Sequence, residues 1–196
     1  MVPRLIAAAC VLTHVFGCSL RVGSRGFHED LSWARSSLSL GSPREAERYL
    51  NQVEAKGLSR AGKVQAKILR AEIELRKGSP ETAIALADEA GAHDRFSAQA
   101  HEVAGKALIQ LSRFEEAIAR FDEALVLYSE RVDIERVVDL VSVAEGFGAY
   151  ADGDPVAANE HWGRIHDSNL AASIEAALRR ARDHTSTAMD VSRRAP

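Results

Sequence analysis

The sequence is poor in cysteine and aromatic residues, and it has no excess of positive charge. Its two cysteines, Cys10 and Cys18, are too few for a disulfide framework or a cysteine-rich zinc cluster. With 25 Lys and Arg against 28 Asp and Glu, the net charge of -3 gives no overall basic field to attract nucleic acid. Aromatic residues make up 6%, so we expect a core of Ala, Leu, Ile and Val, which favours helices.

The proportions of hydrophobic and charged residues are those of an ordinary globular protein. The 196 residues are 46% hydrophobic and 27% charged, which is enough for one domain with a sizeable core. This composition excludes a collagen-like, coiled-coil-only or wholly disordered chain.

The N-terminus has the pattern of an export signal. One basic residue, Arg4, precedes mostly apolar residues at 5–16, a run too short to span a hydrocarbon core of ~30 Å. The run ends in Val-Phe-Gly-Cys at 15–18, which resembles the lipobox of bacterial lipoproteins. In that family the cysteine receives a diacylglyceryl group and the chain is cut just before it. The resemblance implies a signal peptide at 1–17 and lipidation of Cys18. The alternative is a buried N-terminal helix with an incidental cysteine.

A repeat occupies most of the remaining chain. Small residues recur 34 residues apart in three pairs: Ala71 and Gly105, Ala83 and Ala117, Ala90 and Ala124. The copy at 104–125 reads Ala-Gly-Lys-Ala-Leu-Ile-Gln-Leu-Ser-Arg-Phe-Glu-Glu-Ala-Ile-Ala-Arg-Phe-Asp-Glu-Ala-Leu, and it resembles the tetratricopeptide repeat, a helix–turn–helix unit. We expect Ala83 and Ala117 to be buried at helix crossings, with Ala119 on the outer face.

The turns inside the repeats share one chemistry. Gly-Ser-Pro occurs at 41–43 and 78–80, and Gly-Asp-Pro occurs at 153–155. Glycine ends the first helix in a left-handed conformation, and proline fits the first turn of the second helix. Either Ser79 or Asp154 can cap the helix that follows it.

These features predict an all-α solenoid of about four tetratricopeptide-like units over residues 27–166. Residues 18–26 are expected to form the lipidated cysteine and a flexible tether, because 21–26 contains two glycines and a serine. Residues 167–182 predict a C-terminal capping helix, since Asp-Ser-Asn at its start is a helix-capping sequence. Residues 183–196 lose the helical period and are expected to be a disordered tail.

No pattern for catalysis or cofactor binding is present in the sequence. It has no phosphate loop, no nucleophile elbow and no dinucleotide fingerprint. His161 and His166 are five residues apart, which does not place them on one helical face as metal ligands. We therefore expect a non-enzymatic protein without a cofactor, a metal or a small-molecule substrate.

The resemblance implies a concave groove lined by the first helix of each unit. Matching the chain to that pattern places Leu31 and Arg35 there, with the candidate protein-binding residues Leu38, Glu72, Leu75, Lys106, Ile109, Phe147 and Tyr150. The lysines and asparagines with which some family members hold a C-terminal carboxylate are not matched. An amphipathic helix or an extended segment of a protein partner suits such an apolar groove. The alternative is that part of this apolar ladder is core between repeats.

The resulting functional expectation is a non-catalytic, lipid-anchored periplasmic adaptor that binds and helps assemble an envelope protein complex. Membrane contact would be through the anchor only, and no nucleic acid is expected. Ser19 stands where Asp would mark retention in the inner membrane, so the outer membrane is favoured. The alternatives are an accessory subunit of an envelope enzyme, or a cytosolic adaptor if the N-terminus is not cleaved.

Overall fold

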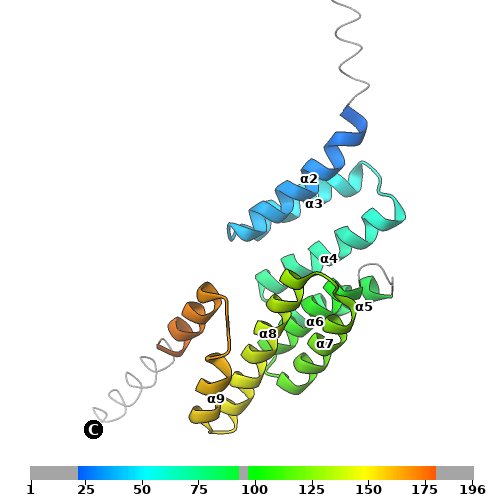
Figure 1. Cartoon of the computed structure of the whole chain (residues 1–196). Helices are drawn as coiled ribbons and strands as arrows, with labels where there is room; N and C mark the ends of the chain where they lie inside the picture. The colour runs from blue at the N-terminus through cyan, green and yellow to red at the C-terminus, as the bar shows by residue number, and fades with distance from the viewer. Residues whose placement is uncertain (1–21, 93–96, 180–196) are drawn as a thin grey trace, which may run out of the picture. The chain divides into compact units, whose positions relative to one another are not determined.

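A computed structural model describes residues 22–92 and 97–179, with side chains described from residue 31. The predicted signal peptide, Cys18 and the disordered tail lie outside the described residues. Residues 22–26 of the predicted flexible tether are described, and they are helical, so the expectation of a flexible segment there is corrected. Eight helices have both ends within the described parts of the chain (Figure 1): α2 Val22–Ser39, α3 Pro43–Ala55, α4 Arg60–Lys77, α5 Pro80–Gly91, α6 Ser97–Gln110, α7 Phe114–Leu127, α8 Arg131–Ala151 and α9 Pro155–Trp162. Residues 168–179 are also helical, and the described residues contain no strand.

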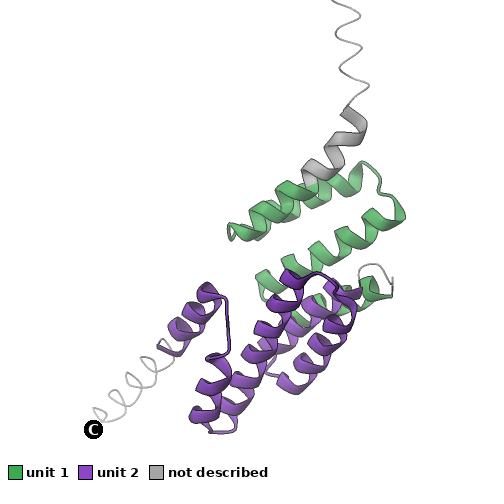
Figure 2. Cartoon of the chain, in the orientation of Figure 1, with its two compact units in different colours: residues 1–96 green, residues 97–196 purple. Residues whose placement is uncertain are grey.

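The helices form consecutive helix–turn–helix pairs in two compact units, residues 1–96 and residues 97–196 (Figure 2). In unit 1, α2 packs on α3 and α4 on α5, and α3 joins the two pairs by packing against α4. In unit 2, α6 packs on α7 and α8 on α9, and α7 packs against α8. The predicted fold class, all-α with repeated helix–turn–helix units, is confirmed. The sequence predicted one array over residues 27–166, whereas the structure divides these residues between the two units.

Small residues let the paired helices approach closely. Ala83 and Ala117 are fully buried, as predicted, whereas Ala119 is exposed on the outer face of α7. A Cβ atom on Gly105 would lie 2.5 Å from Cε1 of Phe121, so only glycine leaves room for that buried ring between α6 and α7. In unit 1 the core is aliphatic, as the low aromatic content predicted, and contains Leu31, Ala34, Leu38, Ala46, Leu50, Val53, Ala66, Leu69 and Ile73.

The three glycine turns adopt the predicted left-handed backbone. Gly41, Gly78 and Gly153 have φ values of +78°, +83° and +83°, and proline is the first residue of each following helix. The two capping predictions have different outcomes. The Asp154 carboxylate accepts hydrogen bonds from the Val156 and Ala157 amides, but the Ser79 side chain makes no capping bond. The backbone geometry at the two positions is similar, so the shorter serine side chain is the main difference.

The C-terminal capping helix begins where the sequence predicted. The carboxylate of Asp167 accepts hydrogen bonds from the backbone amides of Asn169 and Leu170, which satisfies two free donors of the first turn. Ile174 is 5% exposed and anchors the described part of this helix, residues 168–179. Within the described residues, no helix is long and apolar enough to cross a membrane.

Candidate protein-binding surfaces

A hollow of about 490 Å³ lies along α2 in unit 1. It lies between α2 and α4, the first helices of the two pairs in unit 1. The tetratricopeptide resemblance predicted that these first helices line the binding groove. Its lining consists of Leu31, Ser32, Arg35, Ser36, Ser39 and Leu40 from α2 and its C-terminal end, with Gln65 from α4. Leu31 and Arg35 are therefore in the predicted place. The wall of the hollow is more polar than predicted, because three serines line it. Leu31 is only 3% exposed, so it contributes little apolar surface to the wall.

One of the two residues of the apolar ladder predicted for unit 1 is core. Leu38 is 7% exposed and belongs to the aliphatic core, so its assignment to the groove is corrected. Its side chain points toward α3 and α4 because α2 must bury one apolar stripe against those helices. Glu72 and Leu75 are half-buried on α4, and each makes contacts in the structure. Their role in binding stays a prediction.

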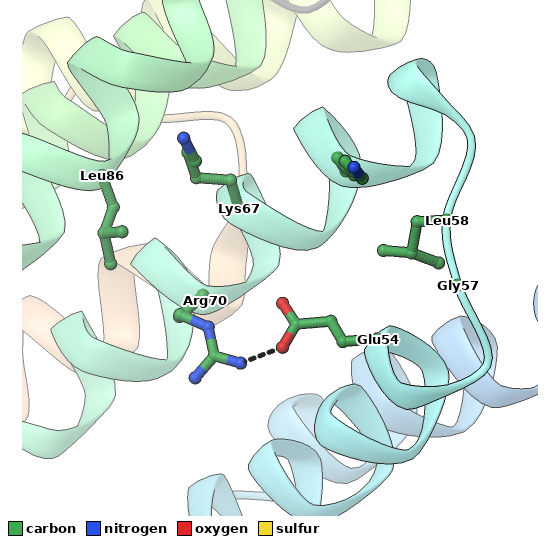
Figure 3. A pocket seen from close by; sticks show the side chains of 7 residues that line it. Glu54, Gly57, Leu58, Lys67, Arg70 and Leu86 are labelled. Atoms are coloured by element: carbon green, nitrogen blue, oxygen red, sulfur yellow. Dashed lines mark hydrogen bonds and ion pairs between the residues drawn. The ribbon is translucent and has the colours of Figure 1, made fainter.

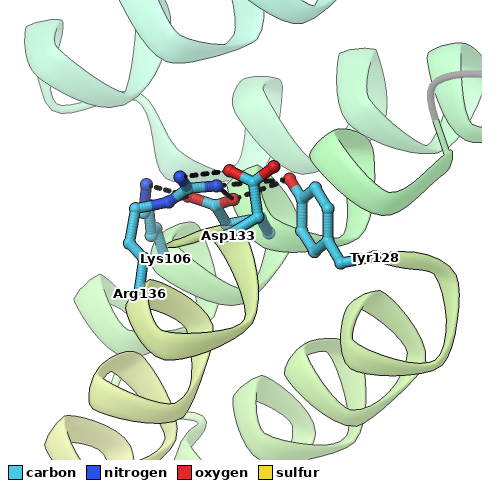
Figure 4. A network of polar contacts seen from close by, with 5 residues as sticks. Lys106, Tyr128, Asp133 and Arg136 are labelled. Carbon is cyan, nitrogen blue, oxygen red and sulfur yellow. Dashed lines mark hydrogen bonds and ion pairs between the residues drawn. The ribbon is translucent and has the colours of Figure 1, made fainter. Parts of the chain in front are cut away.

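In unit 2, a polar network lies where α6 meets the beginning of α8 (Figure 4). Glu102 is its centre, with a side chain that is 8% exposed. Lys106 donates to one Glu102 oxygen at 2.6 Å, and the Tyr128 hydroxyl donates to the other at 2.9 Å. The Arg136 guanidinium donates to both oxygens, at 3.2 and 2.7 Å, and also to Asp133 at 2.6 Å. The network thus ties α6 and the end of α7 to α8.

The charges in this network are balanced, and they set the ionisation of its members. Burial alone would raise the pKa of Glu102. The charge of Lys106 and the hydrogen bonds from Arg136 outweigh burial and lower the pKa to about 2. Burial, reinforced by the Glu102 charge, raises the pKa of the Tyr128 hydroxyl. At neutral pH, Glu102 is therefore a carboxylate that accepts hydrogen bonds and Tyr128 is a neutral donor.

One predicted binding residue, Lys106, belongs to this network, and a second, Ile109, lies beside it. The side chain of Lys106 is 36% exposed while its ammonium group pairs with Glu102. Ile109 is half-buried one turn further along α6. Arg136, which sequence reasoning missed, adds a partly exposed cation from α8. It stands 34 residues after Glu102, so the repeat period itself marks the pair as neighbours on adjacent first helices.

Phe147 does not face a free groove. Its ring stacks on Phe114 of α7 at 6.3 Å and meets Trp162 of α9 edge-on at 5.3 Å. The predicted groove position of Phe147 is therefore corrected: it packs the second helices of two pairs against α8. Tyr150 is 46% exposed at the edge of the same cluster, 6.1 Å from Trp162. Gly146 leaves the space that the Trp162 ring occupies.

Two histidines in the described part of unit 2 lie against carboxylates. His161 Nδ1 lies 2.8 Å from Glu145, and His166 Nδ1 lies 3.0 Å from Asp139. Asp139 is 3% exposed and also accepts hydrogen bonds from the backbone amides of His166 and Asp167, which fixes the connection to the capping helix. The part of the chain that the structure describes holds no cluster of three or more residues that could bind a metal ion.

A separate basic pocket of about 650 Å³ lies in unit 1 (Figure 3). Lys63, Lys67 and Arg70 line it from α4, and the remaining lining consists of Glu54, Gly57, Leu58 and Leu86. Arg70 donates to Glu54 at 2.5 Å and to Asn51 at 2.9 Å, and Lys67 pairs with Glu89 at 2.5 Å. Sequence reasoning missed this pocket, although the spacing of its cations, i, i+4 and i+7, is visible in the sequence.

Residues 31–95 match the tetratricopeptide repeat family. The matched residues correspond to α2–α5 of unit 1, and the same helix–turn–helix pairing continues in unit 2. No curated protein matches the chain. Tetratricopeptide repeats are typically non-catalytic modules that bind proteins, so the match and the fold together suggest a protein–protein interaction adaptor.

Proposed function

We propose that this protein is a non-catalytic, lipid-anchored adaptor of the cell envelope that binds and helps assemble a protein complex. The observation that carries the binding role is the hollow along α2 in the segment that matches the tetratricopeptide family. Leu40 at its rim is 83% exposed, and Arg35 and three serines supply polar contacts. An amphipathic helix or an extended segment has the matching chemistry for such a surface.

The anchoring part of the proposal is supported by the sequence at residues 15–18. Lipidation at Cys18 with the acyl chains that bacterial lipoproteins carry would exceed the two-signal threshold for stable membrane attachment. The attached chain would face the periplasm, from the outer membrane.

Intact-mass measurement of protein extracted from membranes tests the anchor. We expect a chain that begins at a lipid-modified Cys18. Cys18→Ser should leave an unmodified, uncleaved precursor, whereas Cys10→Ser serves as the control and should change nothing. An unmodified wild-type chain that starts at Met1 would contradict the anchor and favour a cytosolic adaptor.

Crosslinking followed by affinity capture from the native membrane tests the binding role. Ser36→Arg should fill the hollow, where residue 36 lines the wall, and reduce capture of the partner at least tenfold. Arg44→Glu, in the first turn of α3 and outside the lining of the hollow, is the control. Equal capture by Ser36→Arg and wild type would refute the hollow as the binding surface. Capture of a catalytic protein would instead favour the role of an accessory subunit of an envelope enzyme.

A further inference from the structure

The basic pocket of unit 1 lies on the other side of α4 from the hollow along α2. Gln65 lines the hollow, and Lys63 and Lys67, two residues before and after it, line the pocket. Positions two residues apart on a helix are separated by about 200° around its axis, so the two surfaces face in opposite directions. The pocket is therefore a second surface, independent of the lipid anchor and of the proposed groove.

The charge of the pocket is not balanced by the chain itself. Three cations line it against one carboxylate, that of Glu54. Glu89 neutralises Lys67 from outside the lining, and Glu54 neutralises Arg70. Lys63 makes no ion pair within the described residues, and it is exposed. One positive charge in the lining of the pocket is left for a ligand.

The pocket also offers apolar surface. Leu58, from the loop between α3 and α4, and Leu86 of α5 are both half-buried and both contribute to the lining. Figure 3 shows their side chains on opposite sides of the pocket, with Arg70 and Glu54 between them. The volume of about 650 Å³ falls within the ~300–1,000 Å³ of ligand-binding pockets. A purely ionic ligand would leave this leucine-lined space unfilled.

We propose that this pocket docks an extended segment of a partner protein in which an acidic residue stands next to an apolar one. The acidic side chain pairs with Lys63 and reaches toward Lys67, which lies one helical turn further along α4. The Cβ atoms of residues four apart on a helix, such as these two lysines, are about 5–6 Å apart. The neighbouring apolar side chain lies between Leu58 and Leu86. Positive charge and apolar walls together distinguish this ligand from an anionic lipid headgroup, which carries no apolar side chain into such a space.

Fluorescence anisotropy with the full-length protein tests the proposal. The probe is a fluorescein-labelled peptide that contains two Glu-Leu dipeptides separated by glycine. We expect saturable binding with a Kd below about 1 mM, weakened by raising the salt concentration because an exposed ion pair is screened. A matched peptide with Gln in place of Glu should bind at least tenfold more weakly.

A pair of charge-matched variants locates the site. Lys63→Glu should raise the Kd of the Glu-Leu peptide at least tenfold, and it should fold normally because an acidic residue suits the first turn of α4. Arg76→Glu makes the same change of net charge on an exposed residue of α4 outside the pocket, and it should change the Kd less than twofold. Circular dichroism melting of both variants verifies that neither has lost the fold.

Several results would overturn the proposal. These are the absence of peptide binding at 1 mM, equal binding of the Gln-Leu peptide, and equal effects of Lys63→Glu and Arg76→Glu. Vesicles that contain phosphatidylglycerol form the last arm. If they bind with dependence on Lys63 while the Glu-Leu peptide does not, the pocket recognises a lipid headgroup and the protein ligand is refuted.

Discussion

Glu102→Gln removes the negative charge that holds Lys106 and Arg136 while keeping the shape of the side chain. The pKa of Glu102 is lowered from 4.5 to about 2 in the folded protein. Each pKa unit corresponds to about 1.4 kcal/mol, so the charged carboxylate contributes about 3 kcal/mol to stability at pH 7. Because its pKa is lowered on folding, this contribution is complete above pH 4.5 and is lost as the pH falls toward 2.

Urea unfolding of wild type and Glu102→Gln at pH 7 and pH 3 measures this contribution. The free energy of unfolding should differ by about 3 kcal/mol at pH 7 and by about half as much at pH 3, where part of the wild-type advantage has been lost. Glu135→Gln, in the exposed pair with Arg131, is the control and should cost less than about 0.5 kcal/mol. A difference below about 1 kcal/mol at pH 7, or one that does not narrow at pH 3, would refute the electrostatic reasoning.

Three further perturbations test the packing. Ala117→Leu should cost roughly 1–3 kcal/mol in urea unfolding because the site is fully buried, whereas Ala119→Leu should change stability by less than about 0.5 kcal/mol. Phe147→Ala should cost about 2–3 kcal/mol because its ring packs on two aromatic neighbours, and the half-exposed Tyr150→Ala should cost less than about 1 kcal/mol. Similar melting temperatures for these last two variants would contradict the assignment of Phe147 to the packing. Asp139→Asn should accelerate hydrogen exchange at the two backbone amides that its carboxylate holds, and unchanged exchange would show that the contact does not restrain the connection to the capping helix.

The turns and the small residues were predictable because both are local signals. Glycine at a left-handed position and proline at the next helix start depend on only a few neighbouring residues, and Gly41, Gly78 and Gly153 all follow that rule. The turn between α6 and α7 is an exception to the glycine rule. Ser112 adopts a φ of +58° there without glycine, so composition gives no signal although the backbone makes the same turn.

The orientation of apolar side chains was harder to predict, because it depends on which helix lies opposite. Leu38 and Phe147 have the same helical spacing as groove residues, and only the packing partners decide which way they face. α3 and α4 bury Leu38, whereas Phe114 and Trp162 enclose Phe147. A period of 34 residues identifies equivalent positions in successive repeats. It does not show whether an apolar side chain at such a position faces the core or the groove.

The same period does predict contacts between charges, if it is applied to charged residues as well as to small ones. Glu102 and Arg136 are equivalent positions of successive first helices, and such helices lie side by side in this fold, so opposite charges there are placed to meet. In unit 2 they form a bidentate pair with distances of 3.2 and 2.7 Å. The preceding equivalent position is Ile68, which is 4% exposed. One position of the repeat is thus apolar core in unit 1 and an ion pair in unit 2, so each unit stabilises the same helix arrangement by different chemistry.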